Sequence, residues 1–124
     1  MGSKLFQLAR WNVVLAWLSW LNKIDFVDIA WHGMIQHDMK NKEIRIHPTQ
    51  KPIQLYKWLL KNYAKEGDKI LDTHLGSGSI AIAIDNVNKI DKMNLTLTAC
   101  ELDKEYFDKS MERIKTQTAQ QTLF

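Results

Sequence analysis

Two short runs in this sequence of 124 residues combine residue types that bind a nucleotide-like cofactor. One is the hexapeptide HPTQKP at 47–52, and the other is LDTHLGSG at 71–78. An apolar strand is expected over 69–72 and a helix from residue 79, so the second run forms a glycine loop at the carboxyl end of a strand. Glycine lets a ligand approach the backbone, and the helix N-terminus attracts a carboxylate or phosphate. The loop alone is equally typical of a plain strand–helix turn.

An acidic residue stands where the partner of such a loop is expected. Glu101 follows a second predicted strand, over 94–100, and comes 23 residues after Gly78. A carboxylate in that place accepts hydrogen bonds from both hydroxyls of a ribose. The alternative is a solvated carboxylate in a mixed run of charges that continues to Glu105. Together with the glycine loop, the position favours ribose binding.

The elements that must position these residues alternate between helix and strand. The pattern predicts helices from Pro52 to about 65, from 79 to about 88 and from 105 to about 117. Gly67 is expected to end the first helix as a left-handed C-cap. Expected buried positions are Leu55, Trp58, Leu59 and Tyr63 in the first helix and Tyr106, Met111 and Ile114 in the last. This order predicts a doubly wound α/β unit with a right-handed crossover.

The N-terminal third is less regular. Residues 1–10 are expected to form a short helix or a loosely held end, and 12–20 are apolar on both faces, which favours a buried strand. We predict a hairpin over 12–32, with a single amphipathic helix over 4–22 as the competing interpretation. The polar run 36–45 is either a solvated connection or a phosphate contact made by Lys40, Lys42 and Arg45.

The composition excludes several classes of protein. Hydrophobic residues make up 45% and charged residues 25%, as in a soluble single domain, and the net charge of +3 permits a nucleic-acid partner. Cys100 is the one cysteine, so no internal disulfide forms, and no Cys/His spacing indicates a metal. The apolar run 13–21 is too short to cross a membrane and lacks a secretory cleavage site. A reducing, cytoplasmic location without membrane contact is expected.

The hexapeptide, the helix after it and the glycine loop together resemble the adenine-N6/cytosine-N4 DNA methyltransferase family. They are similar to the subgroup whose S-adenosylmethionine-binding half follows the catalytic half. Residues 15–20, 31–36 and 118–124 continue the likeness, which covers roughly 13–124. The resemblance implies an α/β, partial Rossmann-like S-adenosylmethionine-dependent methyltransferase fold with an N-terminal hairpin. It divides the chain into a remnant of the catalytic half at 1–45 and a cofactor-binding α/β subdomain at 46–124.

The resemblance implies cofactor contacts for the residues of the glycine loop. Asp72 and the backbone of Gly76 and Gly78 would lie against the amino-acid part of S-adenosylmethionine. A phenylalanine holds the place of His74 in many members, so a ring there should pack beside the ligand. A general-base role for His74 is disfavoured by its place in a cofactor loop.

The remaining contacts follow in the same way. Thr49 and Lys51 would fix the methionine carboxylate through a hydroxyl and a charge. Glu101 would take the ribose hydroxyls, and Leu102 would flank the adenine. For His47, a capping or buried-partner role and direct contact with the cofactor both stay open.

One expected feature of the family is absent from the sequence. The family's base pocket is built on an Asp/Ser/Asn-Pro-Pro-aromatic loop, which receives a base rotated out of double-stranded DNA. The prolines here, Pro48 and Pro52, are not adjacent, so no catalytic residue is assigned. We expect a truncated form that is inactive alone. We also expect a bare sheet edge beside 69–72 and beside the hairpin, compensated by dimerisation, strand exchange or local rearrangement.

Two further hypotheses belong to other classes. The chain is a non-catalytic subunit that pairs with a separate catalytic half, or a module that retains cofactor or DNA affinity for another purpose. A dehydrogenase is disfavoured, because the loop lacks a third glycine at the expected spacing and the hexapeptide has no role there.

Overall fold

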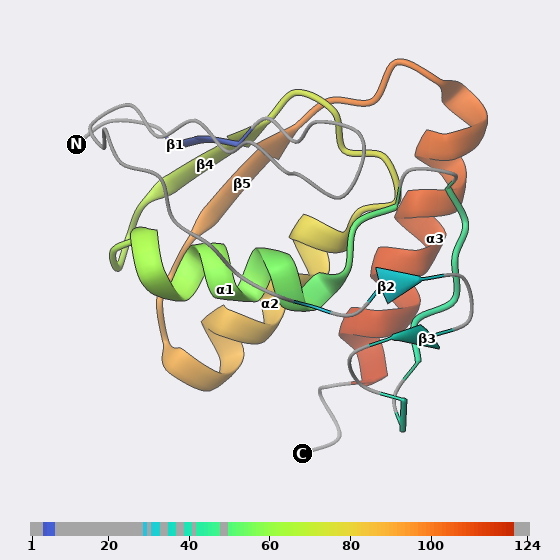
Figure 1. The fold of residues 1–124 in the computed structure, drawn as a ribbon. Helices are drawn as coiled ribbons and strands as arrows, with labels where there is room; N and C mark the ends of the chain where they lie inside the picture. The colour runs from blue at the N-terminus through green and yellow to red at the C-terminus, as the bar shows by residue number, and fades with distance from the viewer. Residues whose placement is uncertain are drawn as a thin grey trace.

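A parallel sheet covered by helices forms the main body of the chain (Figure 1). The computed structural model describes residues 4–6, 29, 31–32, 35–36, 39–40, 42–47 and 50–120. Within them the sheet order is β1 (Lys4–Phe6), β4 (Lys69–Asp72), β5 (Thr96–Ala99). The helices are α1 (Ile53–Tyr63), α2 (Ser79–Asp91) and α3 (Lys104–Gln120). A short antiparallel pair joins β2 (Trp31–His32) to β3 (Ile35–Gln36).

The central strand β4 presents one face to the helices. Ile70 and Asp72 are buried, whereas Lys69 is exposed, as the alternation of a strand requires. The register pairs Ile70 with Leu97 and Lys69 with Thr96, which is also exposed. The face of β4 and β5 away from the helices carries Lys69, Thr96 and Thr98 together with the half-buried Leu71. α1 and α2 lie together beneath the other face (Figure 1).

Helix α2 lies between α1 and α3 and contacts both. Its small residue Ala83 is fully buried, which permits the close approach expected from the sequence. The core cluster consists of Leu55, Tyr56, Leu59, Leu60, Ile70, Leu75, Ile80, Ala83, Ile84, Val87 and Leu95. Four of these come from α1, so the helix that follows the hexapeptide is anchored by its apolar face.

Helix α1 begins as predicted but ends differently. Pro52 is its N-cap, and the missing N–H of proline leaves no donor unpaired there. The C-cap is Ala64 in an extended conformation, so the prediction that Gly67 caps this helix is wrong. Gly67 does adopt the left-handed conformation expected of it, with φ of +81°, and its N–H donates to the carbonyl of Met93. The glycine belongs to the turn that leads into β4.

The N-terminal residues supply a strand that the sequence did not predict. β1 runs parallel to β4, with Leu5 opposite Leu71. The expectation of a short helix or loose end therefore fails at 4–6, and the edge of β4 that we expected to be bare is occupied. Three residues with few side-chain signals give no periodicity from which such a strand is inferred.

The predicted hairpin over 12–32 lies largely outside the described residues. Where the structure does describe it, Trp31–His32 pairs with Ile35–Gln36, which follows it rather than precedes it. The described part of 36–45 is irregular after Gln36, consistent with the predicted surface connection.

The remaining elements confirm the predicted order with small shifts. The strand over 69–72 is confirmed residue for residue, whereas β5 is shorter than expected and α2 and α3 are longer. Met111, expected on the buried side of α3, is 46% exposed, and the neighbouring Ser110 is buried instead. Tyr106 and Ile114 are half-buried as expected, so the contact stripe runs through 106, 110 and 114, and Met111 lies at its edge. No helix in the described part is long and apolar enough to cross a membrane.

Candidate functional site

The glycine loop 73–78 connects the carboxyl end of β4 to the start of α2. Backbone hydrogen bonds tie it to the end of β5: Leu75 N–H donates to the carbonyl of Cys100 at 2.8 Å, and Cys100 N–H donates to that of Asp72 at 3.0 Å. Gly78 N–H closes the turn by donating to the Leu75 carbonyl at 3.0 Å. The carboxyl ends of two adjacent parallel strands thus meet at one place, where open α/β sheets bind ligands.

Glu101 and the glycine loop are in direct contact. One carboxylate oxygen of Glu101 accepts from Gly76 N–H at 2.8 Å, and the other accepts from Asp103 N–H at 2.9 Å. The structure therefore joins two sequence signals that lie 25 positions apart. A charged acceptor makes such bonds shorter and stronger than neutral ones, so the acid fixes the loop as well as the turn into α3.

Asp72 is a buried acid at the end of β4. Its Oδ1 accepts from the backbone N–H of His74 at 2.9 Å. Burial raises the pKa of Asp72 to about 6, and the nearby charge of Glu101 adds to this, against the bond from His74. The pKa of Tyr56 in α1 is raised mainly by burial and further by the nearby charge of Asp72. Among the ion pairs of the described residues, none includes Asp72, so this carboxylate is suited to a cationic ligand group.

The two loop glycines have different surroundings. Gly76 has φ of +58°, and a Cβ there would meet only the His74 carbonyl, at 3.9 Å. Gly78 has φ of +81°, and a Cβ there would lie 2.8 Å from Cδ1 of Ile114 in α3. Gly78 is thus needed for helix packing, and Gly76 leaves open space beside the loop.

The other predicted residues of the loop region are exposed. His74 bonds through Nδ1 to the Thr73 hydroxyl at 2.9 Å. Leu102 follows Glu101, and its apolar side chain is fully exposed, so a planar ligand could pack against it.

The hexapeptide is described in part. Thr49 lies outside the described residues. Lys51 is half-buried, and burial lowers the pKa of its ammonium group. The ring of His47 packs on Tyr106 of α3, with centroids 4.2 Å apart, which supports the buried-partner role left open by the sequence. Gln50 is buried and braces the segment before it, accepting from Ile46 N–H at 2.9 Å and donating to the Ile44 carbonyl at 3.2 Å.

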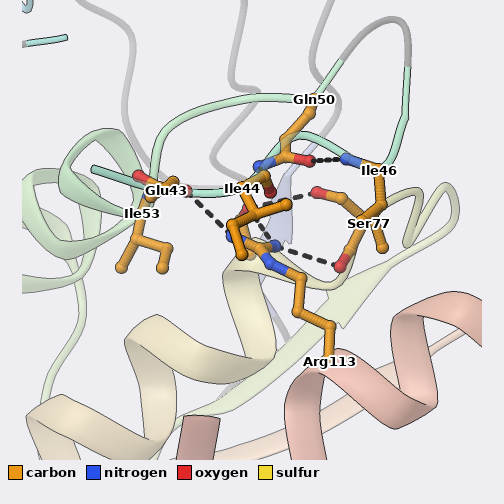
Figure 2. Close-up of polar contacts among 8 residues, drawn as sticks. Glu43, Ile44, Ile46, Gln50, Ile53, Ser77 and Arg113 are labelled. Atoms are coloured by element: carbon orange, nitrogen blue, oxygen red, sulfur yellow. Dashed lines mark hydrogen bonds and ion pairs between the residues drawn. The ribbon is translucent and has the colours of Figure 1, made fainter. Parts of the chain in front are cut away.

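A buried ion pair that the sequence did not reveal lies behind the glycine loop (Figure 2). Arg113 of α3 donates to the Ser77 carbonyl at 3.1 Å, to the Ser79 hydroxyl at 2.9 Å and to Glu43 at 2.9 Å. The second oxygen of Glu43 accepts from the N–H of Ile53 at 2.8 Å. In the sequence, Arg113 is marked only by its place one position before Ile114. That place does not identify Glu43, 70 residues away, as its partner.

The predicted nucleic-acid residues share one segment. Lys40, Lys42 and Arg45 are all exposed, and Glu43 between them points inward to Arg113. In the described part of the chain, no three His, Cys, Asp or Glu side chains are grouped as a metal site requires.

This fold and site belong to a known class. Residues 12–112 match the family model described as DNA methylase, which unites N6- and N4-methyltransferases, and the chain belongs to that family. The chain is 35% identical over 83 residues to the Type II methyltransferase M.HpaI of Haemophilus parainfluenzae, an alignment that covers 60% of this chain and 26% of the relative. These findings confirm the resemblance inferred from the two sequence runs.

A solved structure shares the fold. The crystal structure of an M1.HpyAVI–SAM complex matches with a TM-score of 0.53 and 24% identity, over 82% of this chain and 47% of that chain. The match confirms the partial Rossmann-like methyltransferase fold. The chain spans about a quarter of the curated relative's length and about half of the solved chain's length.

Proposed function

We propose that this chain is the S-adenosylmethionine-binding portion of a DNA amino-methyltransferase, one that modifies adenine N6 or cytosine N4. The observation that carries the proposal is the bond from Gly76 N–H to Glu101 at the carboxyl ends of β4 and β5. This bond holds an acid against a glycine loop at the edge of the sheet where the fold class binds nucleotides, which supports ribose binding by Glu101.

The donors and acceptors of the site fit this cofactor. The ammonium group of its methionine part suits Asp72, a buried acid whose pKa of about 6 a cation would lower. The open space beside Gly76 allows the ligand close to the backbone. Glu101 can accept from ribose hydroxyls, since each carboxylate oxygen has more than one acceptor site. When bound, the cofactor supplies an activated methyl group.

The remaining predicted contacts extend the site on both sides. In the proposal, Thr49 and Lys51 hold the methionine carboxylate, Leu102 flanks the adenine, and the ring of His74 packs beside the ligand. The exposure of Leu102 and His74 leaves their side chains available for such contact.

The proposal also keeps the division of the chain at residue 45. Residues 46–124 would form the cofactor-binding subdomain, and residues 1–45 would derive from the catalytic half. The contribution of β1 to the sheet supports a joint fold of the two parts rather than two independent ones.

Methyl transfer by these 124 residues alone is not expected. They contain no Pro-Pro-aromatic loop, which in this family receives the amine of an extruded base. The proposed DNA contacts are Lys40, Lys42 and Arg45, whose charges would bind phosphates and make the affinity fall with salt. The alternative role is a non-catalytic subunit or binding module that pairs with a separate catalytic chain, in the cytoplasm.

Calorimetric titration of the pure protein with S-adenosylmethionine tests the cofactor assignment. We expect saturable binding in a 1:1 ratio. Glu101→Gln should weaken it about tenfold or more, because hydrogen bonds to a charged group contribute about 1.5–3 kcal/mol. Glu105→Gln on the exposed side of α3 is the matched control and should leave the affinity unchanged. Absence of binding to folded wild-type protein would refute the proposal.

A methyl-transfer assay with tritiated cofactor and double-stranded DNA separates the two roles. We expect no transfer by the chain alone. Transfer that appears on adding a polypeptide with the Pro-Pro-aromatic loop would favour the subunit role. Light scattering after size exclusion tests dimerisation, one of the three compensations expected for a bare sheet edge, and a monomer at low concentration would count against it.

A further inference from the structure

The guanidinium of Arg113 joins α3 to two segments that are distant from it in sequence, the start of α2 and the segment 42–47. Its side chain is only 9% exposed, and its acceptors come from the glycine loop, the first residue of α2 and the segment 42–47. The carbonyl of Ser77 and the hydroxyl of Ser79 lie on either side of Gly78, the N-cap of α2. Arg113 therefore donates hydrogen bonds to both ends of the turn that starts this helix.

Glu43 links Arg113 to the helix that follows the hexapeptide. Its carboxylate is 13% exposed and is shared between Arg113 and the first N–H of α1, at Ile53. A carboxylate at a helix N-terminus is favoured by the partial positive charge there. Because 47–52 lies between Glu43 and Ile53, both ends of the hexapeptide are tied to one ion pair. Figure 2 shows the guanidinium of Arg113 between Glu43 and Ser77, with a dashed line to each.

We propose that the Glu43–Arg113 pair is a positioning device that sets the hexapeptide and the glycine loop at the spacing required to bind one cofactor. The inference rests on the proposed function, because the hexapeptide and the loop supply the two groups of proposed contacts. Neither side chain is assigned a contact with the ligand. The pair acts through Ile53, directly after the hexapeptide, and through Ser77 and Ser79 at the start of α2.

The chemistry of the pair requires arginine at position 113. Three acceptors in different directions match the planar fork of a guanidinium, whereas an ammonium group is a compact charge without that fixed geometry. Burial lowers the pKa of Arg113, and the charge of Glu43 opposes that change, so the two groups depend on each other for neutralisation. The exposed pair Lys109–Glu105 on the same helix has no such link to the loop.

Four variants test this role: Arg113→Lys, Arg113→Met, the double variant Glu43→Gln/Arg113→Met, and Lys109→Met as the matched control. Removing one partner of a buried pair destabilises strongly, whereas removing both leaves no uncompensated charge. The double variant therefore keeps the test valid if Arg113→Met does not fold. Circular dichroism and thermal unfolding establish which variants are folded at the titration temperature.

Two readouts are measured on the folded variants. Calorimetry gives the affinity for S-adenosylmethionine, and amide hydrogen exchange gives the protection of Gly76 and Gly78 relative to Leu60 in α1. In the double variant we expect affinity to fall about tenfold or more, and loop protection to fall by a similar factor, with protection of Leu60 unchanged. Arg113→Lys should fall between wild type and the double variant, and Lys109→Met should match wild type.

The outcomes separate this inference from the proposed function. If wild type binds the cofactor and the folded double variant binds it equally well with equal loop protection, the positioning role is wrong and the proposed function stands. If wild type binds no cofactor, the proposed function fails, and the exchange data alone decide whether the pair orders the loop. A uniform loss of protection that includes Leu60 would overturn the inference in favour of a purely structural pair.

Discussion

Replacement of Gly78 by alanine should destabilise the protein more than the same change at Gly67. Both glycines have φ of +81°, so the conformational cost of a side chain, about 1–2 kcal/mol, is common to both. At Gly67 nothing lies within 4 Å of the new Cβ, whereas at Gly78 it would lie 2.8 Å and 2.9 Å from two carbons of Ile114. Forcing a methyl group into packed surroundings adds about 1–3 kcal/mol.

Urea unfolding followed by circular dichroism measures both variants. We expect Gly67→Ala to lower the free energy of unfolding by about 1–2 kcal/mol and Gly78→Ala by about 2–5 kcal/mol. In a double-mutant cycle, Ile114→Ala should recover most of the additional loss, because it removes the colliding carbons. Equal losses at the two glycines would refute the conclusion that Gly78 is required by contact with α3.

Two further predictions concern buried polar side chains. In the folded protein the pKa of Asp72, about 6, lies above the value of about 4 that is usual for an aspartate. Ionisation of this buried group therefore lowers the stability of the fold as pH rises from about 4 to above 6, by at most about 3 kcal/mol. Asp72→Asn should therefore stabilise the ligand-free protein in urea unfolding at pH 7.5 relative to pH 4, and an equal effect at both pH values would contradict the burial argument. Gln50→Ala removes two backbone bonds and should cost about 1–2 kcal/mol, whereas the exposed Gln54→Ala should cost little; equal thermal shifts would disprove the bracing role.

The sequence predicted local features better than contacts between distant segments. The strand over 69–72 follows from a short apolar run between Gly67 and the glycine loop, and both signals are local. The proximity of Glu101 to the glycine loop could also be inferred from the sequence, because parallel strands end at one edge of a sheet. The C-cap of α1 was not predictable, because alanine is not a residue type that marks a helix end, and Ala64 still donates its N–H to the Leu60 carbonyl.

Contacts of large sequence separation account for the failures. The partner of Arg113 is 70 residues away, and neither the arginine nor the glutamate stands in an unusual local pattern. β1 is identified only by its pairing with β4 and not by its own three residues. Such pairings depend on tertiary packing, which overrides the weak propensities of short segments.

The position of β1 also has a consequence for biosynthesis. Lys4 is synthesised 66 positions before Ile70, its partner in the sheet. At rates of about 5–20 residues per second, the first strand waits roughly 3–13 seconds for its neighbour. Until β4 has been synthesised, the backbone donors and acceptors of β1 have no strand partner, and an unpaired strand of this kind is open to aggregation.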